Sequence, residues 1–271
     1  MEERGMNKRI QKLRRQSLDT PARIYMERAD LMTDAYKMYE GSVSVPEMRA
    51  LAFKHFMANK HLCINDGELI VGEKGDGPQK SPTFPELCCH TLEDMHVMND
   101  RDLISFKVTD EDLKLQEEKI IPYWENRSIR HKIINSTTQE WKDCYESGIF
   151  TEFMEQRGPG HTVGSQKIYT KGFLDYKQDI QNALDKLDFL NDPEALDKQN
   201  ELNAMSISCD AIMILGQRYA ALARELAEKE TDPVRKEELL QIAHNCDVVP
   251  AHKPETYWQA IQMYWFVHLG V

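Results

Sequence analysis

The sequence predicts a mainly helical chain with one β-hairpin, and two patterns lead to this fold class. In most segments apolar residues recur three or four positions apart, as on one face of a helix. Around residues 62–71 the pattern changes: Leu62 and Ile64 alternate with Cys63 and Asn65, Asp66-Gly67 follows, and Leu69 to Val71 are apolar. Asp-Gly between two apolar runs is typical of a tight hairpin turn. We therefore expect the β-hairpin near residues 62–71 and helices elsewhere.

The bulk composition is that of a globular protein. The chain has 271 residues, of which 41% are hydrophobic and 29% charged, and its formal net charge is −11. This length suits one large domain or two small ones. The negative charge disfavours nucleic acid and anionic membranes as partners. There is no secretory signal and no apolar run long enough to cross a bilayer, so we expect a cytoplasmic location.

Cysteine usage gives no sign of a metal centre. The six cysteines have no regular spacing and form no C-x-x-C pair. Zinc and iron–sulfur sites are usually recognised by such spacing. We therefore expect reduced thiols and no bound metal.

The first sixty residues predict three helices. Five cations without a following apolar stretch indicate a short basic amphipathic helix: Lys8, Arg9, Lys12, Arg14 and Arg15. Apolar residues at helical spacing predict a second helix over residues 21–39, and Gly41 is suited to its C-cap. Pro46, a favoured first-turn residue, begins a third helix that runs to about Asn59.

The predicted hairpin is followed by a loop. Residues 72–85 are rich in Gly, Pro, Lys and Ser. Within the first hundred residues this loop is the best candidate for a surface that faces a substrate or a partner. Its glycines at positions 72, 75 and 77 do not form a phosphate-binding loop, because the Lys-Ser/Thr pair and the helix start that such a loop needs are missing.

The rest of the chain is predicted to be helical, apart from one turn. Segments with helical periodicity are residues 86–98, 110–126, 138–155 with a break at Gly148, 172–190, 204–229, and one that Asp232 caps with Pro233 in its first turn. The last segment opens at Pro254 and ends in the apolar run Met263 to Val271. Chain ends are usually polar, so we expect this chain to be the front portion of a longer protein.

The most unusual stretch is Phe150 to Gly164, in which a Gly-Pro-Gly turn leads directly to His161. Glycine on both sides of Pro159 permits backbone angles that other residues resist, and proline stiffens the middle. A lone histidine after a turn is often structural or merely exposed. Its imidazole also titrates near neutral pH, which suits proton transfer. The residues alone leave both interpretations open.

Several motifs resemble a known family. Residues 27–33, 64–72 and Gly158 to His161 are similar to the N-terminal portion of the glycyl radical enzymes, the pyruvate formate-lyase family. The resemblance continues through Val249-Pro250-Ala251 to Trp265 and so covers nearly the whole chain. It implies an α/β fold in which residues 1–271 are the N-terminal, mainly helical part of a ten-stranded α/β barrel.

The resemblance also implies what this chain lacks. Family members carry a thiyl-forming cysteine in mid-sequence and a radical glycine near the C-terminus, and neither motif occurs in these residues. Residues 1–271 would therefore be a truncated part of a single pyruvate formate-lyase domain, without the C-terminal glycine radical domain. We expect the chain to bind no cofactor itself and to be inactive alone.

Within the family, residues 150–161 and 252–256 are most similar to a dehydratase branch. This implies loss of water from trans-4-hydroxy-L-proline to give 1-pyrroline-5-carboxylate. The full-length protein would carry a glycyl radical, installed by an activating enzyme that uses S-adenosylmethionine and a [4Fe–4S] cluster, and would form a homodimer. His161 matches a catalytic, substrate-contacting position, and Phe153 matches a position that packs against the substrate ring.

Two alternatives stay open. Other glycyl radical enzymes share the Pro-Gly-His element, among them glycerol and propanediol dehydratases, choline trimethylamine-lyase and formate acetyltransferase-like members. Alternatively, the chain is a non-catalytic helical module whose apolar end, from Met263 onward, binds a partner.

Overall fold

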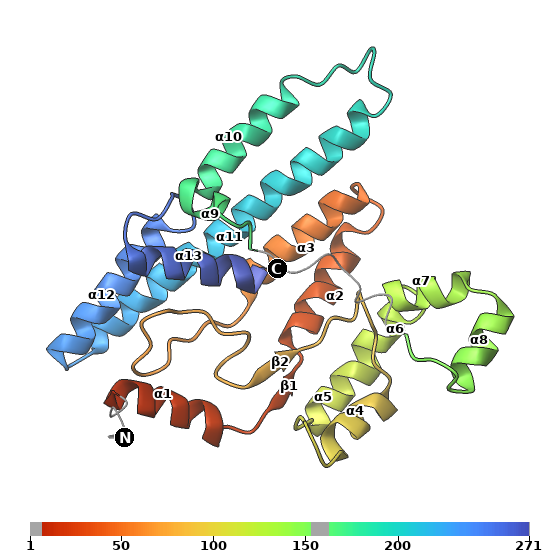
Figure 1. Cartoon of the computed structure of the whole chain (residues 1–271), viewed down its shortest axis with the longest axis horizontal. Helices are drawn as coiled ribbons and strands as arrows, with labels where there is room; N and C mark the ends of the chain where they lie inside the picture. The colour runs from red at the N-terminus through yellow and green to blue at the C-terminus, as the bar shows by residue number, and fades with distance from the viewer. Residues whose placement is uncertain (1–6, 153–162, 271) are drawn as a thin grey trace. The chain divides into compact units, whose positions relative to one another are not determined.

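The computed structural model describes residues 7–152 and 163–270, and it is mainly helical, as the sequence predicts (Figure 1). The chain divides into two compact units. Unit 1 comprises Met1–Thr20, Asp34–Lys80 and Thr162–Val271. Unit 2 comprises Pro21–Thr33 and Ser81–His161.

Unit 1 is built around one long helix, α11. Its elements are α1 (Lys8–Asp19), the second half of α2 (Glu27–Tyr39), α3 (Val45–Asn59), α9 (Lys167–Thr170), α10 (Phe173–Leu184), α11 (Ala195–Lys229), α12 (Pro233–Val248) and α13 (Tyr257–Gly270). Helix α11 packs against α3, α12 and α10, which run beside it in Figure 1. Its buried face is rich in small residues, including Ala211, Gly216, Ala220 and Ala223, so neighbouring helices can approach closely.

The helix starts in unit 1 follow the capping signals of the sequence. The Ser44 side chain accepts a hydrogen bond from the backbone N–H of Glu47, and Pro46 lies in the first turn of α3. The Asp232 side chain accepts one from the N–H of Val234, at 3.0 Å, ahead of α12. Both predicted starts, near Pro46 and at Asp232-Pro233, are confirmed. Each cap stabilises its helix by satisfying a backbone donor that has no partner within the helix.

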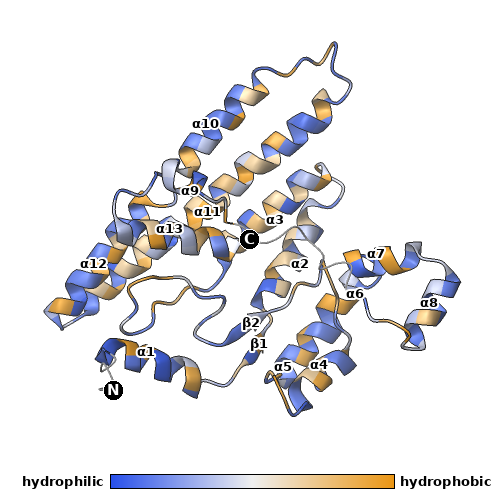
Figure 2. Ribbon diagram, viewed as in Figure 1, coloured by the Kyte–Doolittle hydropathy of each residue, from blue (hydrophilic) through white to orange (hydrophobic). Residues whose placement is uncertain are grey.

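The core of unit 1 lies where α11 meets α13. Tyr219 and Phe266 are fully buried there, with ring centroids 5.6 Å apart. Met263 is also fully buried. Helix α1 differs, since hydrophilic residues cover most of it and none of its residues is buried (Figure 2).

Unit 2 combines short helices with two short strands of the described residues. Its elements are β1 (Arg23–Tyr25), β2 (Lys80–Pro82, from Ser81 on), the first half of α2, α4 (Leu92–Asp100), α5 (Asp110–Leu115), a π-helix (Gln116–Ile120), α6 (Ile121–Trp124), α7 (Ile129–Ser136) and α8 (Gln139–Glu146). Strands β1 and β2 pair in a two-stranded sheet. Met95 and Ile120 are fully buried, and the Trp124 indole donates to the Thr33 hydroxyl at 2.8 Å.

The predicted hairpin at residues 62–71 is wrong. A turn forms at Asp66-Gly67, but no strand flanks it. The backbone groups of Leu69, Val71 and Gly72 bond instead to side chains of α13. Alternating apolar residues favour an extended segment, and here a helix supplies the partners that a second strand would offer.

Other differences concern element boundaries. The helix predicted over residues 138–155 ends at Glu146, before the predicted break at Gly148. The helix predicted over 86–98 begins only at Leu92, where Thr91 and Asp94 form a capping box. The helix predicted over 204–229 already begins at Ala195. The sequence prediction missed α7, α9 and the two strands, all of which are short.

The described residues contain neither a membrane-spanning helix nor a metal-binding cluster. None of the helices in residues 7–152 and 163–270 combines the length and apolar character that a membrane span requires. Within those ranges no three His, Cys, Asp or Glu side chains gather as a metal site would require. All six cysteines are free thiols, and Cys209 and Cys246 are buried.

Candidate functional site

The two predicted site residues, Phe153 and His161, lie outside the described residues. The structure describes the segments on either side of them, one in each unit. It also describes a second feature, the segment from residue 65 to 73, which covers the end of the predicted hairpin and the start of the predicted loop.

The N-terminal flank is fixed in unit 2 by aromatic packing. The Phe150 ring lies 5.1 Å from the Trp141 ring and 6.0 Å from the Tyr145 ring, and Trp141 and Tyr145 stack on each other at 5.3 Å. Arg130 donates to the Tyr145 hydroxyl at 2.7 Å and to the backbone carbonyl of Glu152 at 3.4 Å. Side chains of α7 and α8 therefore hold the chain up to the residue before Phe153.

The C-terminal flank is fixed in unit 1 by a small apolar cluster. Val163 packs against Ile168, Val249 and Met263, which are 3%, 0% and 0% exposed. Gly164 follows with φ +79°, and a Cβ there would lie 2.7 Å from Ile168 Cγ2. A side chain at this position would both strain the backbone and collide with the cluster, so the turn requires glycine.

Three side chains of α13 hold the extended segment 69–72. The Trp258 indole N–H donates to the Leu69 carbonyl, and that of Trp265 to the Gly72 carbonyl, both at 2.7 Å. Between them, the Gln262 amide accepts from the Val71 N–H at 2.9 Å and donates to the Val71 carbonyl at 2.8 Å. Positions 258, 262 and 265 share one face of a helix. Gln262 thus acts as a substitute for a neighbouring strand.

Two carboxylates meet beside this segment. Asn65 donates through its backbone and side chain to Glu68, at 2.7 and 2.8 Å, and through its side chain to Glu73, at 3.0 Å. Partial burial, and secondly the nearby negative charge of Glu68, raise the pKa of the Glu73 carboxyl. Glu73 is therefore a more easily protonated carboxylate than a free side chain.

The segment also borders an open hollow of about 530 Å³ in unit 1. One wall is α1, through Ile10, Leu13 and Gln16, and the other is formed by residues 65–79. Residues 72–85 were predicted to form a substrate-facing or partner-facing loop. Pro78 and Gln79 from that range do line the hollow.

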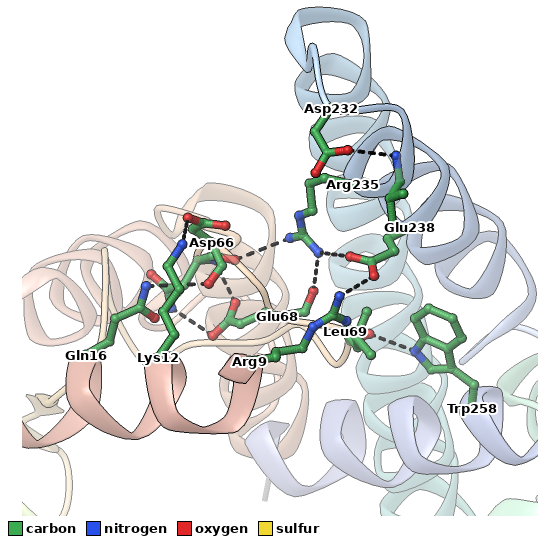
Figure 3. A network of polar contacts seen from close by, with 12 residues as sticks. Arg9, Lys12, Gln16, Asp66, Glu68, Leu69, Asp232, Arg235, Glu238 and Trp258 are labelled. Carbon is green, nitrogen blue, oxygen red and sulfur yellow. Dashed lines mark hydrogen bonds and ion pairs between the residues drawn. The ribbon is translucent and has the colours of Figure 1, made fainter. Parts of the chain in front are cut away.

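Arg235 joins this segment to α12 (Figure 3). It donates to the Glu68 carbonyl at 2.7 Å, to the Asn65 carbonyl at 3.4 Å and to the Glu238 carboxylate at 3.0 Å. Its side chain is only 11% exposed. This role of Arg235 was not predicted from the sequence, because an arginine that binds backbone carbonyls leaves no periodic signal.

Comparisons with known proteins connect these features to one family. The model of the pyruvate formate lyase-like family matches residues 5–271. The chain is 60% identical, over 99% of its length, to trans-4-hydroxy-L-proline dehydratase of Clostridioides difficile, of which it covers 34%. It is 32% identical, over 91% of its length, to isethionate sulfite-lyase of Desulfovibrio desulfuricans, of which it covers 31%. The chain thus spans about a third of the length of these relatives.

Solved structures agree with the sequence comparisons. The hydroxyproline dehydratase of Clostridioides difficile, solved with trans-4-hydroxy-L-proline bound, superposes with a TM-score of 0.94 over 99% of this chain and 34% of its own. The B12-independent glycerol dehydratase of Clostridium butyricum, at 30% identity, gives 0.90 over 99% of this chain and 34% of its own. The helix-rich fold, the family model and these similarities agree, and the chain belongs to the pyruvate formate lyase-like family of glycyl radical enzymes.

Proposed function

We propose that this chain is the N-terminal part of a glycyl radical dehydratase that converts trans-4-hydroxy-L-proline to 1-pyrroline-5-carboxylate and water. The observation that carries the proposal is the 60% identity, over 99% of the chain, to trans-4-hydroxy-L-proline dehydratase of Clostridioides difficile. Relatives that act on other substrates match at about half that identity. The proposal concerns the whole protein, because the chain spans only a third of the relative.

The reaction places two demands on the residues near the substrate. Breaking the C4–O bond releases the hydroxyl group, which leaves far more easily as water than as hydroxide, so a proton donor is required. In the whole protein the glycyl radical supplies one-electron chemistry that starts with hydrogen removal beside the ring nitrogen. The intermediate also needs apolar surroundings that exclude water.

His161 and Phe153 are proposed to meet these demands. An imidazolium at His161 donates the proton to the leaving hydroxyl, since imidazole titrates near neutral pH. Phe153 forms an apolar wall against the ring. The support is the match of Gly158 to His161 to the family motif, together with the fixed flanks: Phe150 on the α8 aromatic rings, and Val163 in its buried cluster.

The remaining parts of the proposal follow from the family. The whole protein forms a homodimer, is activated by an enzyme that uses S-adenosylmethionine and a [4Fe–4S] cluster, and works in the cytoplasm on a free small molecule. This chain itself is proposed to bind no cofactor.

The substrate is tested with the gene product that carries this chain, activated under anaerobic conditions. We expect hydroxyproline to give pyrroline-5-carboxylate by mass spectrometry, while glycerol and isethionate stay unchanged. Conversion of glycerol or isethionate without conversion of hydroxyproline would refute the proposed substrate.

The role of His161 is tested by His161→Gln in the same protein. We expect turnover to fall about 10²- to 10⁴-fold, the usual contribution of a positioned acid, while the glycyl radical signal in electron paramagnetic resonance stays. His244→Gln is the matched control, because His244 is exposed on α12. Unchanged turnover in His161→Gln would remove this residue from the chemistry.

A further inference from the structure

Helix α1 is attached to unit 1 without burying any of its residues. Its apolar side chains Ile10 and Leu18 are 54% and 69% exposed. The helix has 12 residues. Isolated helices of about that length are marginal in water, so α1 depends on the contacts that hold it in place.

Those contacts are polar (Figure 3). Arg9 pairs with Glu238 of α12, and Lys12 pairs with Asp66 of the turn. Gln79 donates to Ser17 at 3.0 Å, and Gln16 donates weakly to the Asp66 carbonyl at 3.4 Å. The Lys12 and Asp66 side chains are 53% and 66% exposed. Such an exposed ion pair changes an equilibrium constant by no more than about fivefold.

Apolar packing adds little beneath the helix. Ile10 and Leu13 line the hollow of about 530 Å³ together with Leu69, Ile70 and Pro78. Side chains that line an open hollow lose some of the dispersion contacts of a packed core. The apolar face of α1 therefore contributes only weakly to the attachment of the helix.

The opposite wall is fixed without α1. Trp258, Gln262 and Trp265 of α13 hold the backbone of residues 69–72. Arg235 of α12 holds the carbonyls of Asn65 and Glu68. Removing α1 breaks none of these bonds. The attachment of α1 and the folding of this segment therefore have separate causes.

We propose that α1 is a strap, held by the Arg9–Glu238 and Lys12–Asp66 ion pairs, which detaches as one unit while the rest of unit 1 stays folded. Detachment uncovers the wall formed by residues 65–79 and frees the Asp66 and Glu238 carboxylates from their ion pairs. This uncovered face is acidic and apolar, so it is complementary to a basic amphipathic helix, which is the chemistry of α1 itself. Salt screens ion pairs, so the strap opens more often as ionic strength rises.

Hydrogen exchange of the 271-residue chain, followed by mass spectrometry, tests this proposal. The test variant is Arg9→Gln/Lys12→Gln. The matched control is Arg14→Gln/Arg15→Gln, which removes the same charge from the same helix. Arg14 and Arg15 take part in no ion pair among residues 7–152 and 163–270. Gln has nearly the helix propensity of Arg and Lys, so neither variant changes the intrinsic stability of α1 much.

We expect exchange of the α1 amides to quicken about tenfold in the test variant and less than twofold in the control. Peptides from α11 and α13 keep their rates in both. Raising salt from about 0.02 M to about 0.5 M should quicken α1 in the unsubstituted chain and narrow the difference between the variants. Equal rates in α1 for the two variants would overturn the proposal. So would exchange of α1 only at the rate of α11, because α1 would then open only with the whole unit.

Discussion

Gln262 should be one of the positions of unit 1 where a substitution of similar side-chain volume lowers stability most. Its side chain is 1% exposed, and its amide satisfies both backbone groups of Val71, a residue with no exposed surface. Gln262→Leu keeps the side-chain volume roughly constant but removes both hydrogen bonds. Water cannot replace them while the segment stays buried.

The magnitude follows from the two orphaned groups. Each buried donor or acceptor left without a partner costs about 1–3 kcal/mol. Burying the leucine in place of the amide returns about 1 kcal/mol, since much of the Gln262 side chain is apolar already. We expect the free energy of unfolding to fall by about 3 kcal/mol. Urea denaturation followed by circular dichroism measures this as a lower midpoint with an unchanged slope.

Two further variants separate this mechanism from general damage to the core. Gln178→Leu, at an exposed position of α10, should change stability by no more than about 0.5 kcal/mol. Gln262→Glu keeps an acceptor for the Val71 N–H but loses the donor, and its loss of stability should shrink on acidification, when the carboxyl group carries a proton that it can donate. A loss below about 1 kcal/mol in Gln262→Leu would refute the role of Gln262 as a strand substitute.

The other predictions concern glycine, a carboxylate and a thiol. Gly72→Ala should lower the urea midpoint well below that of Gly41→Ala. Both glycines have positive φ, but only at Gly72 would a Cβ meet Trp265, at 2.7 Å, and Leu269; equal losses would contradict this. Glu73→Gln should raise the midpoint at neutral pH. The folded-state pKa of Glu73 is raised, so ionisation of Glu73 costs stability as pH rises. The stability gained in Glu73→Gln should therefore vanish in acid, where Glu73 is protonated. A gain in stability that does not depend on pH would point to another cause. Cys246 is 2% exposed, and burial raises its pKa. A thiol reagent should therefore label the partly exposed Cys144 before Cys246 in the native chain. Similar labelling rates for the two thiols would mean that α12 opens readily.

Local signals of the sequence predicted two helix starts correctly. Pro46 lies in the first turn of α3, and Asp232 with Pro233 marks the first turn of α12. The physical reason is that a cap acts within a few residues, so its effect depends little on the rest of the fold. Gly148 likewise follows the end of α8, with φ +75°.

Signals that depend on distant partners were less reliable. Residues 62–71 have a hairpin pattern, but α13, almost two hundred residues further on, supplies the hydrogen bonds of Val71. The early start of α11 at Ala195 and the short strands β1 and β2 were also not predicted. The family motif around His161 was found in the sequence, and its catalytic role stays a prediction, since Phe153 and His161 lie outside the described residues.

The sequence by itself determined the helical class, the caps and the family, because these depend on short-range chemistry and on motifs read in order. Only the tertiary structure decided that segment 65–73 bonds to α12 and α13, that Glu73 has a raised pKa, and that α1 is held by ion pairs over an open hollow. Each of these depends on which side chains from distant parts of the chain come within a few ångströms of one another. Spacing along the sequence does not encode that distance.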